Sequence, residues 1–180
     1  MKAQQEGILG VLGGMGPQAT NTFYQRIIDR TQAETDQEHL RVLIWSDAKI
    51  PDRTAGILAG PEAAEQVYQA LLDGARLLER AGCTVLAIPC NTAHYFYDKL
   101  EQTAGVPILN MVEETVLHVK KRGVKKPALL ATTGTVAAKT YQRMFEKHDM
   151  AFAVPDEKHQ NMVMQLIYGD IKQGKRADMA

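Results

Sequence analysis

This 180-residue sequence has few cysteines and little tryptophan. It also has no excess of one charge and no long apolar run. Two cysteines are present, and two cannot build the disulfide framework of a small secreted protein. We therefore expect a reducing, cytoplasmic setting in which each thiol needs its own explanation. The formal net charge is +0, with no long run of one sign, which argues against a nucleic-acid partner or an anionic membrane.

Membrane and secretion signals are missing as well. No apolar stretch reaches the length of a membrane span, and the polar start at residues 1–6 is not typical of a signal peptide. What is present is the composition of a globular protein, with 45% hydrophobic and 23% charged residues. A chain of this length can form one ordinary domain or two small ones.

Short apolar runs alternate with amphipathic stretches, which predicts an α/β fold of parallel sheets with helices on both faces. The expected strands cover residues 7–12, 40–45, 84–89, 107–111, 127–131 and 151–154. The expected helices cover residues 17–32, 61–81, 91–104, 113–122, 135–147 and 156–173. Residues 46–60 are expected to form a loop.

One triplet recurs along the chain. Tyr24-Gln25-Arg26 returns as Tyr141-Gln142-Arg143, both times on an expected helix that follows a strand and a Gly/Thr-rich turn. A match of three residues can arise by chance, so duplication and coincidence are both kept open. Duplication would give two similar lobes, residues 1–105 and 106–180, whose strand ends face each other across a ligand cleft.

Cys90 is the candidate catalytic residue, because it lies where the expected third strand ends and a helix begins. Unpaired backbone N–H groups and the helix dipole favour a thiolate at such a position. Its neighbours Asn91 and Thr92 could cap the helix or bind a carboxylate. A buried structural cysteine with capping neighbours is the alternative, and position alone leaves both open.

Cys83 and His94 are less suited to chemistry. Cys83 lies at the entrance to the same strand, which favours an inert buried thiol. Cys90 and His94 could in principle share a zinc ion, but no further Cys or His completes a cluster nearby, so no metal is expected. His94 is interpreted as an orienting or a packed histidine.

The glycine-rich turn at residues 10–17 fits only the loose form of the dinucleotide fingerprint. Pro17 removes a backbone donor that a pyrophosphate would use. No acidic residue follows at the usual distance of about 20 residues, since Asp47 comes roughly ten too late. We therefore interpret the turn as a close approach of the backbone to a small ligand and expect no nucleotide cofactor.

Further polar residues stand near expected strand ends. Arg53, in the expected loop, could grip a carboxylate with two parallel hydrogen bonds, and a solvated loop arginine is the equal alternative. Asp52 is its neighbour. Thr132 follows the strand expected at residues 127–131, and Lys172 on the last expected helix would ordinarily be taken for a surface lysine.

Together these segments resemble the cofactor-independent aspartate/glutamate racemase family. The matching segments are Leu12-Gly13-Gly14-Met15-Gly16-Pro17, Pro51-Asp52-Arg53-Thr54, Pro89-Cys90-Asn91-Thr92-Ala93-His94, Leu130-Ala131-Thr132-Thr133-Gly134-Thr135 and residues 167–174. Their order along the chain argues against coincidence, and the resemblance runs from about residue 7 to the end.

The resemblance implies two similar α/β lobes, each a parallel sheet flanked by helices, with the active site in the cleft between them. It implies a homodimeric racemase of aspartate or a related small acidic amino acid that needs neither pyridoxal phosphate nor metal. One thiolate removes the α-proton, and a second thiol returns a proton to the opposite face. Hydrogen bonds and positive charge at the carboxylate stabilise the developing carbanion.

Individual roles are carried over by position. Cys90 resembles the acid/base of the first lobe. The implied substrate-binding residues are Met15, Asp52, Arg53, Asn91, Thr92, Thr132 and Lys172. Among them, Arg53 resembles the ligand of the substrate carboxylate. Asn91, Thr92 and Thr132 resemble binders of the α-carboxylate or the amine.

One departure from the family concerns the second thiol. The family's second cysteine is expected in a Gly-Cys-Thr segment after the last helix, and no cysteine follows Cys90 in this sequence. We therefore expect a second lobe that lacks its final strand and this cysteine. A non-racemising amino-acid or dicarboxylate binding protein on the same scaffold is the alternative function. A nucleotide-dependent enzyme that relies on the glycine turn is a third.

Overall fold

The computed structural model describes residues 7–174, so the expectations for the polar start and for the end of the chain lie outside the described residues. The chain divides into two compact units. Unit 1 comprises Met1–Pro51, Gln66–Cys90 and Phe96–Leu109. Unit 2 comprises Asp52–Glu65, Asn91–Tyr95 and Asn110–Ala180. The two lobes expected at residues 1–105 and 106–180 remain a proposal.

A parallel sheet forms the centre of unit 1. Its strand order is β2-β1-β3-β4, and every pairing is parallel. The strands are β1 Ile8–Gly13, β2 Arg41–Ser46, β3 Val85–Ala87 and β4 Ile108–Leu109. The predicted α/β class is therefore confirmed, and the carboxyl ends of these strands lie at one edge of the sheet.

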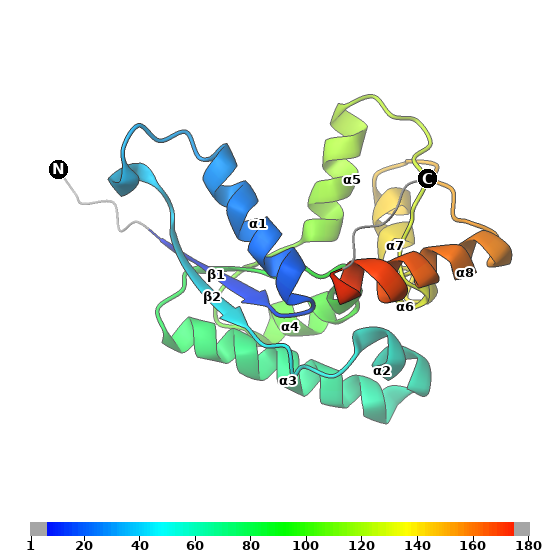
Figure 1. Cartoon of the computed structure of the whole chain (residues 1–180), viewed down its shortest axis with the longest axis horizontal. Helices are drawn as coiled ribbons and strands as arrows, with labels where there is room; N and C mark the ends of the chain where they lie inside the picture. The colour runs from blue at the N-terminus through cyan, green and yellow to red at the C-terminus, as the bar shows by residue number, and fades with distance from the viewer. Residues whose placement is uncertain (1–6, 175–180) are drawn as a thin grey trace. The chain divides into compact units, whose positions relative to one another are not determined.

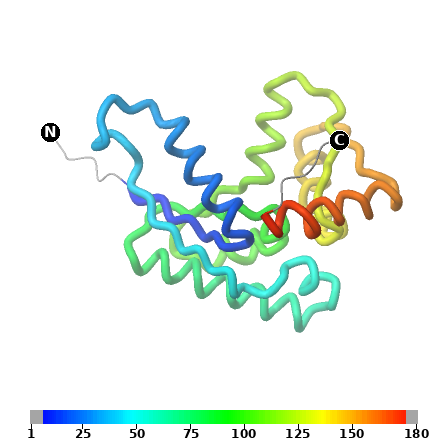
Figure 2. Tube along the Cα trace, viewed as in Figure 1, coloured from blue at the N-terminus to red at the C-terminus, as the bar shows by residue number. Residues whose placement is uncertain are grey.

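Helices cover both faces of this sheet. α1 (Pro17–Arg30) lies on one face, whereas α3 (Pro61–Arg80) and α4 (Tyr97–Thr103) lie on the other (Figure 1). The chain can be followed from β1 through α1 to β2 in Figure 2. The buried face that the spacing in α3 predicts is confirmed, since the residues at that spacing are fully buried: Val67, Leu71, Ala75 and Leu78.

Unit 2 is mainly helical within the residues that the structure describes. Its helices are α2 Arg53–Ala59, α5 Met111–Lys121, α6 Thr133–Ala137, α7 Thr140–Lys147 and α8 Glu157–Gln165. α5 and α7 pack around a small apolar core of Val112, Val116, Tyr141 and Phe145. The strands expected at residues 127–131 and 151–154 are represented by one parallel bridge between Ala128 and Ala153.

The loop expected at residues 46–60 is wrong in its second half, because α2 begins there. The Asp52 carboxylate caps α2 by accepting a hydrogen bond from the Ala55 N–H at 2.8 Å. An aspartate just ahead of a short apolar stretch is a helix-start signal that the sequence analysis did not use.

Two further expected helices are interrupted. The helix expected at residues 135–147 is split into α6 and α7 at Lys139, whose φ of 53° is left-handed. The last helix continues from α8 into a π-helical turn, Leu166–Asp170, and a 3-10 turn, Ile171–Gln173. Among residues 7–174, none of the helices combines the length and the apolar character that a membrane span requires.

Candidate active site

Cys90 lies three residues past the end of β3, at the carboxyl edge of the sheet of unit 1, and its side chain is partly buried. The expectation that an α-helix begins at this cysteine is wrong. The 3-10 helix Thr92–Phe96 follows it, and α4 begins only at Tyr97. The helix dipole is therefore a weaker reason to expect a thiolate at Cys90. The position of Cys90 at the edge where ligands of α/β sheets bind still supports a chemical role.

The second thiol has a different environment. Cys83 lies just ahead of β3 and is 3% exposed. Burial raises the pKa of the Cys83 thiol, because a thiolate is poorly solvated in such a place. The expected burial of Cys83 is confirmed, and a buried neutral thiol is a poor nucleophile and a poor base.

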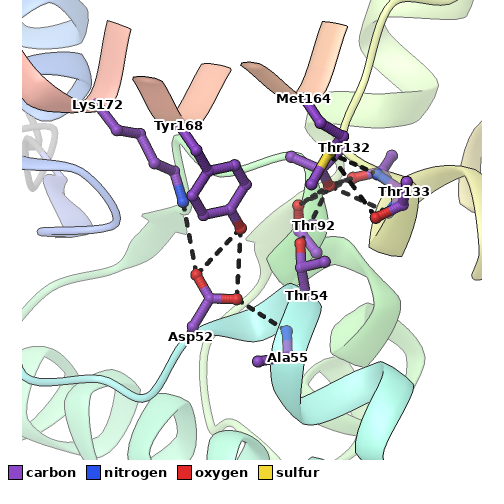
Figure 3. Close-up of polar contacts among 10 residues, drawn as sticks. Asp52, Thr54, Ala55, Thr92, Thr132, Thr133, Met164, Tyr168 and Lys172 are labelled. Carbon is purple, nitrogen blue, oxygen red and sulfur yellow. Dashed lines mark hydrogen bonds and ion pairs between the residues drawn. The ribbon is translucent and has the colours of Figure 1, made fainter. Parts of the chain in front are cut away.

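Four threonine hydroxyls of unit 2 form one hydrogen-bonded group, which we call the threonine cluster: Thr54, Thr92, Thr132 and Thr135. Thr92 Oγ1 lies 3.0 Å from Thr132 Oγ1 and 2.9 Å from Thr135 Oγ1. The Thr54 hydroxyl donates to Thr132 Oγ1 at 3.2 Å (Figure 3). The structure thus brings together Thr92 and Thr132, which the sequence analysis selected, with two threonines that it missed.

Local structure explains how α2 and α6 bring their hydroxyls together. Thr132 is the N-cap of α6, and its hydroxyl accepts the Thr135 N–H at 3.2 Å. Gly134 permits a close approach, since a Cβ at that position would lie 2.9 Å from the Thr54 Cα. The capping pattern of a threonine three residues ahead of Thr135 could have pointed to this cluster from the sequence.

Asp52 and Lys172 form an ion pair, with Lys172 Nζ 3.6 Å from Asp52 Oδ2. The Tyr168 hydroxyl donates to the same carboxylate, at 3.1 Å from Oδ2 and 3.3 Å from Oδ1. Lys172 Nζ also lies 4.0 Å from the centroid of the Tyr168 ring. Figure 3 shows both side chains pointing at Asp52. Tyr168 was missed, although its spacing of four from Lys172 places both on one helical face.

These contacts determine the charge of Asp52. Burial acts to raise its pKa, but the Ala55 N–H, the Lys172 ammonium and the Tyr168 hydroxyl together hold the pKa below its ordinary 3.8. Asp52 is therefore ionised at neutral pH. Its charge serves the cap of α2 and the pair with Lys172.

The structure also places Arg53 and Met15. Arg53 is the first residue of α2 and is 7% exposed, so the solvated-loop alternative is wrong. Met15 is buried in unit 1, just after β1. Their roles in binding a substrate remain predictions.

Asn91 and His94 both have partners in unit 2. Asn91 is exposed, and its Oδ1 accepts a hydrogen bond from the Tyr141 hydroxyl at 2.6 Å. His94 is buried, and its Nε2 accepts the Met111 N–H at 3.1 Å, so the packed histidine of the two alternatives is confirmed. Within residues 7–174, no group of three or more His, Cys, Asp or Glu side chains could hold a metal ion.

The glycine turn after β1 is occupied by its own chain. The Gly14 N–H donates to Thr20 Oγ1 at 2.9 Å. Gly14 has a φ of +89°, and a Cβ there would lie 2.3 Å from the Asp47 carbonyl carbon. The close backbone approach that the sequence predicts is therefore an approach to Asp47, and one donor that a phosphate would need is already used.

Comparison with known protein families gives a match over most of the chain. A family model described as Asp/Glu/Hydantoin racemase matches residues 12–180. The broad specificity amino-acid racemase RacX of Bacillus subtilis (strain 168) is 32% identical over 164 residues, which cover 89% of this chain and 69% of that protein.

Solved structures agree with this match. An aspartate racemase of Picrophilus torridus has a TM-score of 0.82 and 31% identity, covering 93% of this chain and 69% of that one. An aspartate racemase homologue from Pyrococcus horikoshii OT3 has a TM-score of 0.73 and 26% identity, covering 94% of this chain and 73% of that one. The chain therefore belongs to the Asp/Glu/hydantoin racemase family and is an isomerase of the amino-acid racemase type.

Proposed function

We propose that this protein moves the Cα proton of aspartate or a related small acidic amino acid, with Cys90 as one of two acid/base groups. One observation carries the proposal. Cys90 is a partly buried thiol at the carboxyl edge of the sheet, and the polar residues Asn91 and Thr92 follow it directly in the chain. The name of the Picrophilus relative supports an acidic substrate, and the name of RacX supports a wider range.

The proposed step needs no external oxidant or reductant. The Cys90 thiolate takes the Cα proton and becomes a thiol, while the electron pair of the C–H bond stays on the substrate as a carbanion. A second acid on the opposite face returns one proton to Cα, which inverts the centre. Proton exchange with water then returns the Cys90 thiol to a thiolate and restores the proton of the second acid.

The developing carbanion needs stabilisation at the substrate carboxylate. Arg53 is the proposed source of positive charge, and the rotatable hydroxyls of Thr92 and Thr132 are proposed donors. Met15, Asp52 and Lys172 complete the proposed substrate-binding set. For the last two, the ion pair of 3.6 Å means that any contact with a substrate involves a pair of opposite charges rather than a lone lysine.

Cys83 is not proposed as the second acid/base group. It is 3% exposed at the start of β3, and burial raises its pKa. With Cys90 as the one partly exposed thiol of residues 7–174, we expect the 180-residue chain to exchange the Cα proton without efficient inversion. A non-racemising binding protein would not exchange this proton at all.

The test follows deuteration and inversion together. The purified chain, with Cys90→Ser and Cys83→Ser variants, is incubated with the D- and L-forms of aspartate and glutamate in heavy water. We expect Cα deuteration in the wild type and in Cys83→Ser, and its loss in Cys90→Ser. Deuteration that persists in Cys90→Ser would remove Cys90 from the mechanism. Inversion at about 1 per second or faster would show that another residue serves the opposite face.

A homodimer in the cytoplasm is part of the proposal. Light scattering of the purified chain tests the dimer, because a particle of one chain mass, 19.9 kDa, would contradict it. Fractionation of the source cell tests the location.

A further inference from the structure

The side chain of Asn91 accepts a hydrogen bond from the buried phenol of Tyr141. Tyr141 lies on α7 and is 6% exposed, and its hydroxyl donates to Asn91 Oδ1 at 2.6 Å across 50 positions of sequence. A separation of 2.6 Å is short, as is usual for a hydroxyl that donates to an oxygen.

This bond decides what Asn91 can offer to a ligand. A side-chain amide has one acceptor oxygen and one NH2 group with two donors. One of the two lone pairs of the oxygen accepts the bond from Tyr141, which turns the oxygen toward the phenol, and the NH2 group makes no hydrogen bond within residues 7–174. Asn91 is exposed, so this group is accessible as a donor. A donor recognises a carboxylate oxygen and cannot accept a hydrogen bond from an ammonium group.

We infer that Tyr141 is a positioning residue that orients Asn91 so that its NH2 group donates to the substrate carboxylate. The inference rests on the proposed function, which makes the ligand an amino acid. It separates two roles, carboxylate or amine, that the resemblance leaves open for Asn91.

The surroundings of Tyr141 bury its ring and favour the protonated hydroxyl. Its ring packs in the core of unit 2 with Val112, Val116 and Phe145, and the centroids of the Tyr141 and Phe145 rings are 6.2 Å apart. Burial raises the pKa of Tyr141, and a side-chain hydrogen bond with Thr115 opposes this shift, so the phenol keeps at neutral pH the proton that it donates to Asn91.

The recurring triplet supplies a matched control. Tyr24 occupies the same place in its triplet on α1, but it is 37% exposed and its hydroxyl makes no hydrogen bond within the described part of the chain. Tyr24→Phe and Tyr141→Phe are the same chemical change, and only the second removes a bond to Asn91.

The first experiment measures the dissociation constant of L-aspartate by calorimetry. Tyr141→Phe should weaken binding about 3- to 10-fold, the range expected for one hydrogen bond, and Tyr24→Phe should leave it unchanged. In an Asn91→Ala background, Tyr141→Phe should have no further effect, because the amide that it orients is gone. A Tyr141→Phe effect of the same size in that background would overturn the inference and make Tyr141 a purely structural residue.

The second experiment reverses the hydrogen-bonding character of position 91. Asn91→Asp keeps the shape and the bond from Tyr141 but removes both donors, so L-aspartate should bind more weakly than to Asn91→Ala. Binding as tight as wild type, or tighter, would mean that position 91 contacts the ammonium group, and the inference would be wrong. Both variants change an exposed side chain, so they test the inference even if Tyr141→Phe does not fold.

The two proposals can fail separately. A wild type that binds none of aspartate, glutamate or alanine and exchanges no Cα proton would overturn the proposed function, and the ligand role of Tyr141 with it. A wild type that binds L-aspartate while Tyr141→Phe binds it equally well would overturn only this inference.

Discussion

Thr92 and Thr132 lie 40 positions apart in the sequence, yet their hydroxyl oxygens are 3.0 Å apart. Each also contacts the hydroxyl of Thr135, at 2.9 Å and 3.1 Å respectively. A short ring of hydroxyls can pass hydrogen bonds among its members, and it can redirect one donor to a bound carboxylate without breaking all of its contacts. The threonine cluster therefore joins segments of unit 2, and two of its members, Thr92 and Thr132, are also proposed to bind the substrate.

Thr135 tests the structural side of this cluster. It is 1% exposed, so Thr135→Val keeps its shape but leaves the Thr92 and Thr132 hydroxyls short of a buried partner. The free energy of unfolding should fall by about 1–3 kcal/mol, the cost of an unmet buried polar group. Urea unfolding measures this loss of free energy, and Thr22→Val, at an exposed position of α1, is the control. A loss no larger than that of the control would contradict a stabilising role.

Asp52 should make stability depend on pH in the acid range. Its pKa is below the ordinary value in the folded state, so its contribution to stability is fully present above the unfolded pKa of about 4. The contribution is lost as pH falls through the lowered folded pKa. Unfolding free energies between pH 7 and pH 3 should therefore decline less in Asp52→Asn than in the wild type. Parallel declines would show that Asp52 gains nothing from its cap and its pair with Lys172.

Glu113 joins α5 to the end of α7. Its Oε1 lies 2.7 Å from Lys147 Nζ and 3.0 Å from His148 Nε2, and the Lys147 hydrogen bond is the main reason that its pKa is lowered. Because the group is partly exposed, Glu113→Gln should cost only about 0.5–1 kcal/mol, and less at high salt. Thermal unfolding at two salt concentrations measures this, with the neighbouring, exposed Glu114→Gln as the control. An effect that does not change with salt would exclude a charge interaction.

The two thiols should differ in reactivity. Cys90 is partly exposed at the edge of the sheet, while Cys83 is buried and has a raised pKa. Limited iodoacetamide treatment at neutral pH should label Cys90 faster, on the order of tenfold. Peptide mass analysis reads both sites from one sample. Faster labelling of Cys83 would contradict the assignment of Cys90 as the acid/base thiol.

Local patterns were sufficient for much of the fold. The buried face of α3 was visible as the spacing of Val67, Leu71 and Leu78, and β1 to β4 were visible as short apolar runs. The edge position of Cys90 followed from such a run. α2 was missed because seven residues carry little periodicity, and its signal was the single cap at Asp52.

The site shows where local patterns end. The sequence alone was enough to select residues of types that could bind a carboxylate: Arg53, Asn91, Thr92 and Thr132. It did not predict which side chains these residues contact. Lys172 was selected as a substrate residue, but its pair with Asp52 was not predicted. That pair, and the bond from the Tyr168 hydroxyl to Asp52, join the N-cap of α2 to the turns after α8.

The sequence by itself determined the α/β class, the strands β1 to β4 with the helices α1 and α3, and the thiol at a strand end. Each of these depends on residues within one or two turns of each other. Only the tertiary structure decided that Tyr141 donates to Asn91 and that Thr54, Thr92, Thr132 and Thr135 share their hydroxyls. Such bonds join segments 40 to 78 positions apart, and their directions depend on how helices pack, which no local spacing records.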